Sequence, residues 1–162
     1  MKLSKDLRKI IYVCLCIIPF LAFYVSGFGI GSEWNMMLFP YITGKNFAFR
    51  ILVEIAAASS VLLMIIDKNF RPKKSWVLYS YSFFVFILLL ADVFSINPIR
   101  SFFSNFERME GFISHAHLFL YFLILITIFK NKADWIKYNT ILFISNIPVV
   151  FIGLMQLLGL ET

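Results

Sequence analysis

Five long hydrophobic runs, separated by short polar connections, constrain this chain more than any other feature of its sequence. They cover approximately residues 10–30, 47–66, 76–96, 112–129 and 138–158. Crossing about 30 Å of hydrocarbon takes roughly 20 residues of helix, so each run can span a bilayer. A transmembrane barrel would show alternating segments of about 10 residues, and runs such as FFVFILLL do not alternate. The sequence therefore predicts an all-α, polytopic membrane protein with five transmembrane helices in a single domain.

The distribution of charge predicts how these helices are oriented. Only 15% of the residues are charged, against about 25% in a soluble domain. Eleven basic residues lie in the tail before the first run and in the second and fourth connections: Lys2, Lys5, Arg8, Lys9, Lys68, Arg71, Lys73, Lys74, Lys130, Lys132 and Lys137. The first and third connections hold only Lys45, Arg100 and Arg108. This asymmetry predicts a cytoplasmic N-terminus and an outside C-terminus, and it explains the net charge of +6 without a nucleic-acid partner.

The first run admits a second interpretation, a secretory signal peptide, because basic residues precede it and Ser26 and Gly27 are small. Its length, and the need of the later runs for an anchored start, favour a retained helix. Cys14 and Cys16 are two residues apart on that helix, so their thiols point in nearly opposite directions. They are not expected to form a disulfide or a metal site.

The third connection, residues 97–111 (NPIRSFFSNFERMEG), has the punctuation of a separate helix. Asn97 can cap its start, Pro98 suits the first helical position, and Gly111 suits the end. At 100° per residue its apolar side chains fall within an arc of about 120°. These side chains are Ile99, Phe102, Phe103, Phe106 and Met109. We therefore predict a short amphipathic helix lying in the outer membrane interface.

Ionisable residues inside the runs are candidates for a site, because a charge in hydrocarbon is costly. At 1.5 Å per residue, Arg50 is expected about 5 Å below the outer surface, Glu54 about 10 Å and Asp92 about 6 Å. His115 or His117 is expected one to two helical turns below the same surface. The sequence thus predicts an intramembrane polar network of Arg50, Glu54, Asp92 and His115 in the outer half of the bundle.

Two roles for this network remain open. Its charges can close the bundle through ion pairs, with Glu54 or Asp92 as the partner of Arg50. Alternatively, Arg50 can bind an acidic or phosphorylated lipid-linked ligand. Arg100 and Arg108 are likewise either headgroup anchors or ligand contacts, because both chemistries place arginines at this depth.

No pattern in the sequence indicates a reaction. His115 and His117 face opposite sides of a helix, which disfavours a metal site. The chain also lacks a glycine-rich phosphate loop, a nucleophile elbow and an HExxH motif. We therefore predict no catalytic residue, no metal and no cofactor from the residues themselves.

Three segments carry a more specific pattern: residues 38–54 (LFPYITGKNFAFRILVE), 71–76 (RPKKSW) and 97–112 (NPIRSFFSNFERMEGF). They resemble the amino-terminal region of bacterial membrane proteins of the O-antigen ligase and O-antigen polymerase superfamily. The resemblance extends over nearly the whole chain from Leu38 onward. Its motifs are sequence patterns rather than catalytic signatures.

This resemblance implies a location, a ligand and a role. Members of the superfamily transfer or polymerise glycans carried on undecaprenyl diphosphate, at the outer face of the bacterial inner membrane, by a metal-independent glycosyl transfer. Their catalytic arginines and histidine lie in a later half, around a large outer loop that this chain does not reach by Thr162. The resemblance therefore implies a scaffold portion, from a fragment or truncated gene product, that contacts membrane lipids and a polyprenyl-diphosphate-linked glycan. A non-catalytic membrane module, such as a transporter component or assembly partner, is the alternative.

Overall fold

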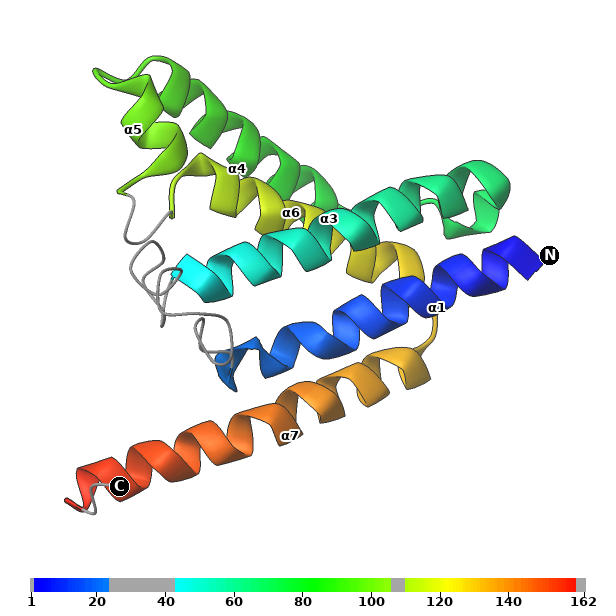
Figure 1. The fold of residues 1–162 in the computed structure, drawn as a ribbon. Coiled ribbons are helices and arrows are strands. Elements are labelled where there is room, and N and C mark those ends of the chain that lie inside the picture. Colours follow the sequence, from blue (N-terminus) through cyan, green and yellow to red (C-terminus); the bar gives the residue numbers. More distant parts are fainter. Residues whose placement is uncertain (1, 24–42, 106–109, 160–162) are drawn as a thin grey trace, which may run out of the picture.

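The computed structural model describes residues 2–23, 43–105 and 110–159, and within these ranges it contains helices and no strand. The helices, in chain order, are α1 (Lys2–Ile17), η1 (Ile18–Phe23), α3 (Thr43–Ile66), η2 (Lys68–Phe70), α4 (Trp76–Val93), α5 (Pro98–Phe103), α6 (Phe112–Ile128) and α7 (Lys132–Leu157). In Figure 1, α1, α3 and α7 run alongside one another, α4 and α6 are inclined across them, and α7 lies at one edge. The prediction of an all-α fold is confirmed for the described residues.

Three of the described helices, α3, α4 and α7, are long and apolar enough to cross a membrane. A fourth, α6, is apolar but shorter, with 17 residues. Of the first predicted span, residues 10–23 are described: α1 begins in the basic tail and gives way to the 3-10 helix η1 at Ile18, next to Pro19. Residues 24–30 of that span lie outside the described residues. Proline disfavours α conformation in the residue before it. These helices indicate a membrane protein, and five complete crossings stay a prediction.

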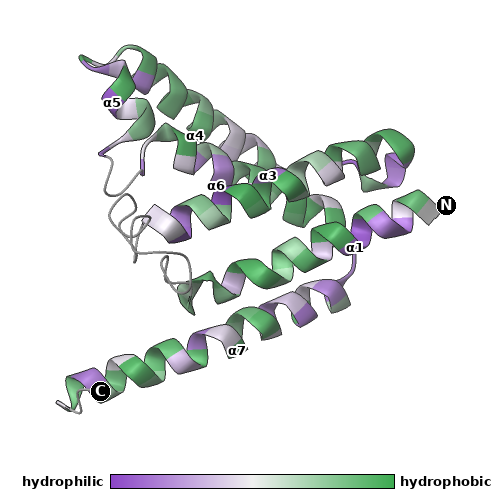
Figure 2. Cartoon of the chain, viewed as in Figure 1, coloured by the Kyte–Doolittle hydropathy of each residue, from purple (hydrophilic) through white to green (hydrophobic). Residues whose placement is uncertain are grey.

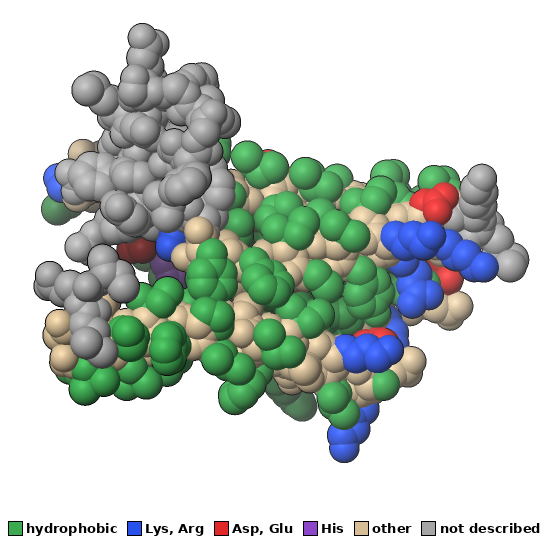
Figure 3. All heavy atoms as spheres, turned by 60° about the horizontal axis from the view of Figure 1, so that its bottom comes forward, with side chains coloured by type: hydrophobic (Ala, Val, Ile, Leu, Met, Phe, Trp, Pro, Cys, Tyr) green, Lys and Arg blue, Asp and Glu red, His purple; other side chains and the backbone are tan. Residues whose placement is uncertain are grey.

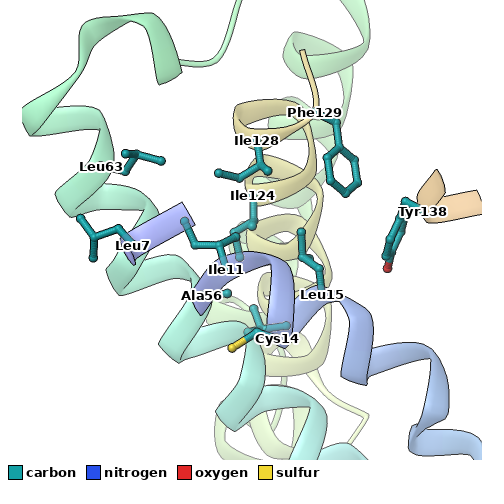
Figure 4. Packing of buried hydrophobic residues seen from close by; sticks show 11 residues of the cluster. Leu7, Ile11, Cys14, Leu15, Ala56, Leu63, Ile124, Ile128, Phe129 and Tyr138 are labelled. Atoms are coloured by element: carbon teal, nitrogen blue, oxygen red, sulfur yellow. The ribbon is translucent and has the colours of Figure 1, made fainter. Parts of the chain in front are cut away.

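The core lies where α1, α3 and α6 pack together (Figure 4). α1 contributes apolar side chains one turn apart, Leu7, Ile11 and Leu15, which all point toward α3 and α6. α3 contributes the small residues Ala56 and Ser60, both almost fully buried. Small side chains let helix backbones approach closely, which is how helices associate when lipid removes the hydrophobic driving force.

Contacts between aromatic side chains join the two peripheral helices, α4 and α7, to α6. Tyr81 of α4 lies against Phe119 and Phe122 of α6, with ring centroids 5.2 and 5.3 Å apart. The α7 residue Tyr138 is hydrogen-bonded through its hydroxyl to Tyr121 of α6. Elsewhere α4 and α7 leave most of their side chains exposed and apolar, as lipid-facing helices do (Figure 2).

The basic segments of the chain meet at one end of the bundle, here called the basic end and defined by Arg8, Arg71 and Lys130. The ammonium group of Lys130 donates to the backbone carbonyl of Arg71 at 3.1 Å. The Arg8 guanidinium lies 5.2 Å from the ring centroid of Phe70. Figure 3 shows Lys and Arg side chains gathered at this end, on the right of the view. The structure thus brings together the basic segments that the charge pattern assigned to one side of the membrane. That this side is cytoplasmic stays a prediction.

The third connection starts as predicted but its helix is shorter. The side chain of Asn97 accepts a hydrogen bond from the backbone N–H of Arg100 at 3.2 Å, and Pro98 occupies the first turn. The helix α5 then ends at Phe103, because Ser104 adopts a φ of 60°. A non-glycine residue with positive φ cannot continue a right-handed helix. The structure therefore does not contain the predicted single helix over residues 97–111.

Gly111 also has a different role from the predicted one, since it caps the start of α6 instead of ending the preceding helix. A Cβ atom at Gly111 would lie 2.3 Å from the carbonyl oxygen of Phe102 and 2.5 Å from that of Ser101. The rings of Phe102 and Phe112 stack edge to face at 5.3 Å. Glycine is needed here because α5 approaches the start of α6 this closely. Residues 106–109, with Phe106 and Met109 of the predicted stripe, lie outside the described residues.

Candidate functional site

Arg50 joins two helices at the end of the bundle opposite the basic end. It lies near the start of α3, is partly buried, and donates from its Nη2 to the hydroxyl of Ser114 in α6 at 2.8 Å. A pocket of about 460 Å³ opens beside this hydrogen bond. Its described lining consists of Asn46, Phe49, Arg50, Glu110, Ser114, His115 and Leu118, and we call it the Arg50 pocket. Figure 3 shows basic, acidic and histidine side chains close together at this end of the molecule.

The Arg50 pocket combines one cation with groups that can donate and accept hydrogen bonds. Its single described cation is the guanidinium, whose planar N–H groups match phosphate and carboxylate oxygens. Phe49 and Leu118 supply apolar wall, and Asn46 and His115 add polar groups. Electrostatic interactions are stronger here than in water, because the surroundings are less polarisable. Such an arrangement can hold an anionic group attached to an apolar chain.

A second polar contact lies about one turn further along both helices. The imidazole Nε2 of His117 is 3.1 Å from a carboxylate oxygen of Glu54. The structure therefore pairs Glu54 with His117, whereas the sequence placed His115 in the network. His115 instead lines the Arg50 pocket, where its Nδ1 is 3.4 Å from the carbonyl oxygen of Gly111.

His117 makes two contacts from one partly buried imidazole. Its Nδ1 is 2.7 Å from the carbonyl oxygen of Ile113, one turn earlier on α6, so Nδ1 donates there and Nε2 is the nitrogen that faces Glu54. The side chain of His117 is 12% exposed, whereas that of Glu54 is 64% exposed. The pair links α3 to α6 and supports the structural role left open for the network.

Asp92 does not join this network. No ion pair links it to Arg50 within the described residues, and it lies in the last turn of α4. The reason is the order of the helices, because α6 packs against both α3 and α4 and so lies between them. Asp92, one of the two partners left open for Arg50, is therefore not paired with it among the described residues.

The other two predicted ligand-binding arginines do not line the pocket as described. Arg100 is exposed on α5, and its guanidinium donates to the side-chain oxygen of Asn105 at 3.2 Å. Arg108 lies outside the described residues. Of the three arginines that were predicted to bind ligand, Arg50, Arg100 and Arg108, only Arg50 is thus among the described residues that line the pocket.

Three polar pocket residues were missed by sequence reasoning: Asn46, Glu110 and Ser114. Asn46 could have been found, because it lies four residues before Arg50 and so shares its helix face. Ser114 and Glu110 carried no such signal, since their proximity to Arg50 depends on how α6 packs against α3. Among the described residues, no three His, Cys, Asp or Glu side chains come together as a metal site would require.

No protein-family model matches the chain, and no curated protein or solved structure matches it at a significant level.

Proposed function

We propose that this chain is the amino-terminal membrane scaffold of an O-antigen ligase-like or polymerase-like protein. In this proposal it acts on glycans linked to undecaprenyl diphosphate at the outer face of the bacterial inner membrane. The observation that supports it is the Arg50 pocket. The segments that carry the resemblance supply much of its lining: residues 38–54 contribute Asn46, Phe49 and Arg50, and residues 97–112 contribute Glu110.

The pocket suits the headgroup of such a lipid. The guanidinium of Arg50 pairs with a phosphate oxygen of the carrier, in the geometry that arginine favours for phosphate. The apolar side chains of Phe49 and Leu118 then contact the first isoprene units, and the remaining chain extends along lipid-facing helices. With the topology predicted from the basic residues, this pocket opens toward the outer leaflet, where the glycan is carried.

The proposed role of this chain is to bind and position the lipid carrier. We assign no catalytic residue to it. The glycosyl transfer itself, which is metal-independent in the resembling superfamily, then needs groups that the Arg50 pocket does not supply.

The proposal is tested by measuring carrier-lipid binding to the full chain in lipid nanodiscs. The probe is undecaprenyl diphosphate, and phosphatidylglycerol at equal concentration is the competitor. We expect Arg50→Gln to weaken binding at least tenfold, because a charge-assisted hydrogen bond contributes roughly 1.5–3 kcal/mol. Arg50→Lys keeps the charge and should retain part of the affinity.

Arg100→Gln is the matched control, because Arg100 is an exposed arginine outside the described pocket lining, and its affinity should stay within about twofold of the original chain. Unchanged binding in Arg50→Gln would exclude the proposed role. Equal preference for phosphatidylglycerol would instead favour the alternative of a non-catalytic membrane module without a carrier-lipid site.

A further inference from the structure

A second pocket, of about 200 Å³, lies where α1, α7 and the end of α6 come together near the basic end. Its described lining includes two charged side chains, Asp134 and Lys137, and the rings of Tyr12, Phe129 and Tyr138. We call it the α1–α7 pocket. It shares no described residue with the Arg50 pocket.

The α1–α7 pocket contains one charge of each sign. Asp134 and Lys137 are three residues apart in α7, so they share a face of the helix with their Cβ atoms about 5–6 Å apart. No ion pair joins them in the described part of the chain. The side chain of Asp134 interacts instead with the hydroxyl of Tyr12, which also interacts with Arg8. The pocket therefore presents a carboxylate and an ammonium group side by side, which suits a ligand that carries both charges.

The aromatic rings of the pocket favour a positively charged group next to the carboxylate. The ring centroid of Phe129 is 5.6 Å from that of Tyr12 and 5.2 Å from that of Tyr138, and Figure 4 shows the latter two side chains. The faces of aromatic rings attract ammonium groups, and proteins use clusters of such rings to bind them. An anionic headgroup gains nothing from these rings or from Asp134.

The polarity of the pocket changes along the helix axes. α1 and α7 both begin at the basic end and run away from it (Figure 1). Two further lining residues, Cys16 and Ile141, come four residues after Tyr12 and Lys137 and so lie about 6 Å deeper in the bundle. Charged groups thus line the outer part of the pocket and apolar groups the inner part, which is the polarity of a phospholipid. A helix with its side chains is about 10–12 Å across, so a pocket of this volume does not admit one.

We propose that the α1–α7 pocket binds a phospholipid with a zwitterionic ammonium headgroup, of the phosphatidylethanolamine type. The ammonium group of the lipid donates to Asp134 and lies against Tyr12, and Lys137 donates to the phosphate. The two charges of phosphoethanolamine are joined by two carbon atoms, a spacing comparable with that of the two side chains. The start of an acyl chain then passes Cys16 and Ile141. This site is independent of the carrier-lipid function, because it lies near the other end of the bundle.

Photolabelling of the full chain in nanodiscs tests the proposal. The nanodiscs contain equal parts of phosphatidylethanolamine and phosphatidylglycerol, with a trace of either lipid carrying a diazirine near the start of one acyl chain. We expect the phosphatidylethanolamine probe to label the peptides around Cys16 and Ile141 about fivefold more than the phosphatidylglycerol probe. Arg50→Gln should leave this ratio unchanged, so the test does not depend on the Arg50 pocket.

Substitutions at the two charges separate their roles. Asp134→Asn should bring the two probes to within about twofold of each other, and Asp134→Lys should reverse the preference, which a misfolded chain would not do. Asp6→Asn is the matched control, because Asp6 is an exposed aspartate of α1 outside the described pocket lining, and it should keep the preference. Lys137→Gln should weaken labelling by both probes, since both carry a phosphate.

Three outcomes would overturn the proposal. The first is equal labelling of the original chain by the two probes, and the second is a preference that survives Asp134→Asn. The third is loss of labelling when excess glycerophosphoethanolamine is added, since this soluble headgroup has no acyl chain and should not displace a bound lipid.

Discussion

The two ends of the bundle use cations in different ways. At the basic end, Lys130 donates to backbone carbonyls of Arg71 and Ile126, and Arg8 lies over the ring of Phe70. None of these contacts is an ion pair. At the other end, Arg50 is partly buried between α3 and α6, beside a pocket that also holds a carboxylate and an imidazole.

This difference separates charges that orient the protein from a charge that can act in a site. Cations in exposed connections are hydrated and screened, so each contributes little to stability. A cation held between helices keeps a fixed position and acts in a less polarisable medium. Substitutions at the Arg50 pocket and its neighbours should therefore cost more, and depend more on position, than substitutions at the basic end.

The largest effect is expected for Gly111→Ala, next to the Arg50 pocket. The added Cβ would meet the backbone carbonyl of Phe102 at 2.3 Å, and neither backbone can move without separating α5 from α6. We expect the free energy of unfolding to fall by about 3 kcal/mol, as for an overpacked site. Reversible unfolding in mixed micelles measures it.

Gly153→Ala is the matched control for that variant, because a Cβ at Gly153 meets no atom within 4 Å. Replacing a helical glycine with alanine there should leave stability unchanged or raise it by up to about 1 kcal/mol. Similar losses of stability in both variants would show that the close approach of α5 to α6 at Gly111 is not the cause of the loss.

The next largest effect on stability is expected for His117, and it should exceed the effect of the same substitution at His115. His117→Leu leaves Glu54 without its 3.1 Å partner and should lower the free energy of unfolding by about 1–2 kcal/mol. His115→Leu removes an exposed side chain with only a 3.4 Å contact, so its effect should stay within about 0.5 kcal/mol. The same unfolding measurement ranks them, and a larger loss for His115→Leu would reverse the assignment of the pair.

The features of the fold that could be predicted are those that depend only on residues close together in the sequence. Asn97 and Pro98 mark the start of α5 correctly, because capping depends on the first turn alone. The end of that helix was predicted wrongly, since Ser104 and the role of Gly111 follow from how α5 packs on α6. Residues that begin or end a helix do not indicate a tertiary contact of this kind.

The candidate site shows the same division. Counting residues from the ends of the runs placed Arg50 and Glu54 at the level of the histidines. It could not choose between His115 and His117, because α6 is apolar on all sides and its sequence does not indicate which face meets α3. It also could not exclude Asp92, since the order in which helices pack is not visible in their hydrophobicity.

A smaller effect is expected at the basic end, from the contact between Arg8 and Phe70. A double-mutant cycle with Arg8→Gln and Phe70→Leu should give a coupling energy of about 0.5–1 kcal/mol, the usual range for an exposed cation over an aromatic ring. The contact should weaken as salt is added. A coupling energy larger than the loss in His117→Leu would contradict the contrast between the two ends.

The smallest effect concerns a single pKa at the basic end. Burial, and then the nearby charge of Lys73, lower the pKa of Lys130 below its ordinary value of 10.5. Lys73→Gln removes the repulsion but not the burial, so the pKa of Lys130 should rise while staying below that value.

Titration of methyl-labelled lysines by NMR measures this shift, with Lys74→Gln as the control that should leave the pKa of Lys130 in place. Because the folded chain holds the Lys130 proton less tightly than the unfolded chain, stability should increase as the pH rises through the lowered pKa. In Lys73→Gln this increase should be smaller and begin at higher pH. A pKa of Lys130 that falls in Lys73→Gln would contradict the repulsion between the two ammonium groups.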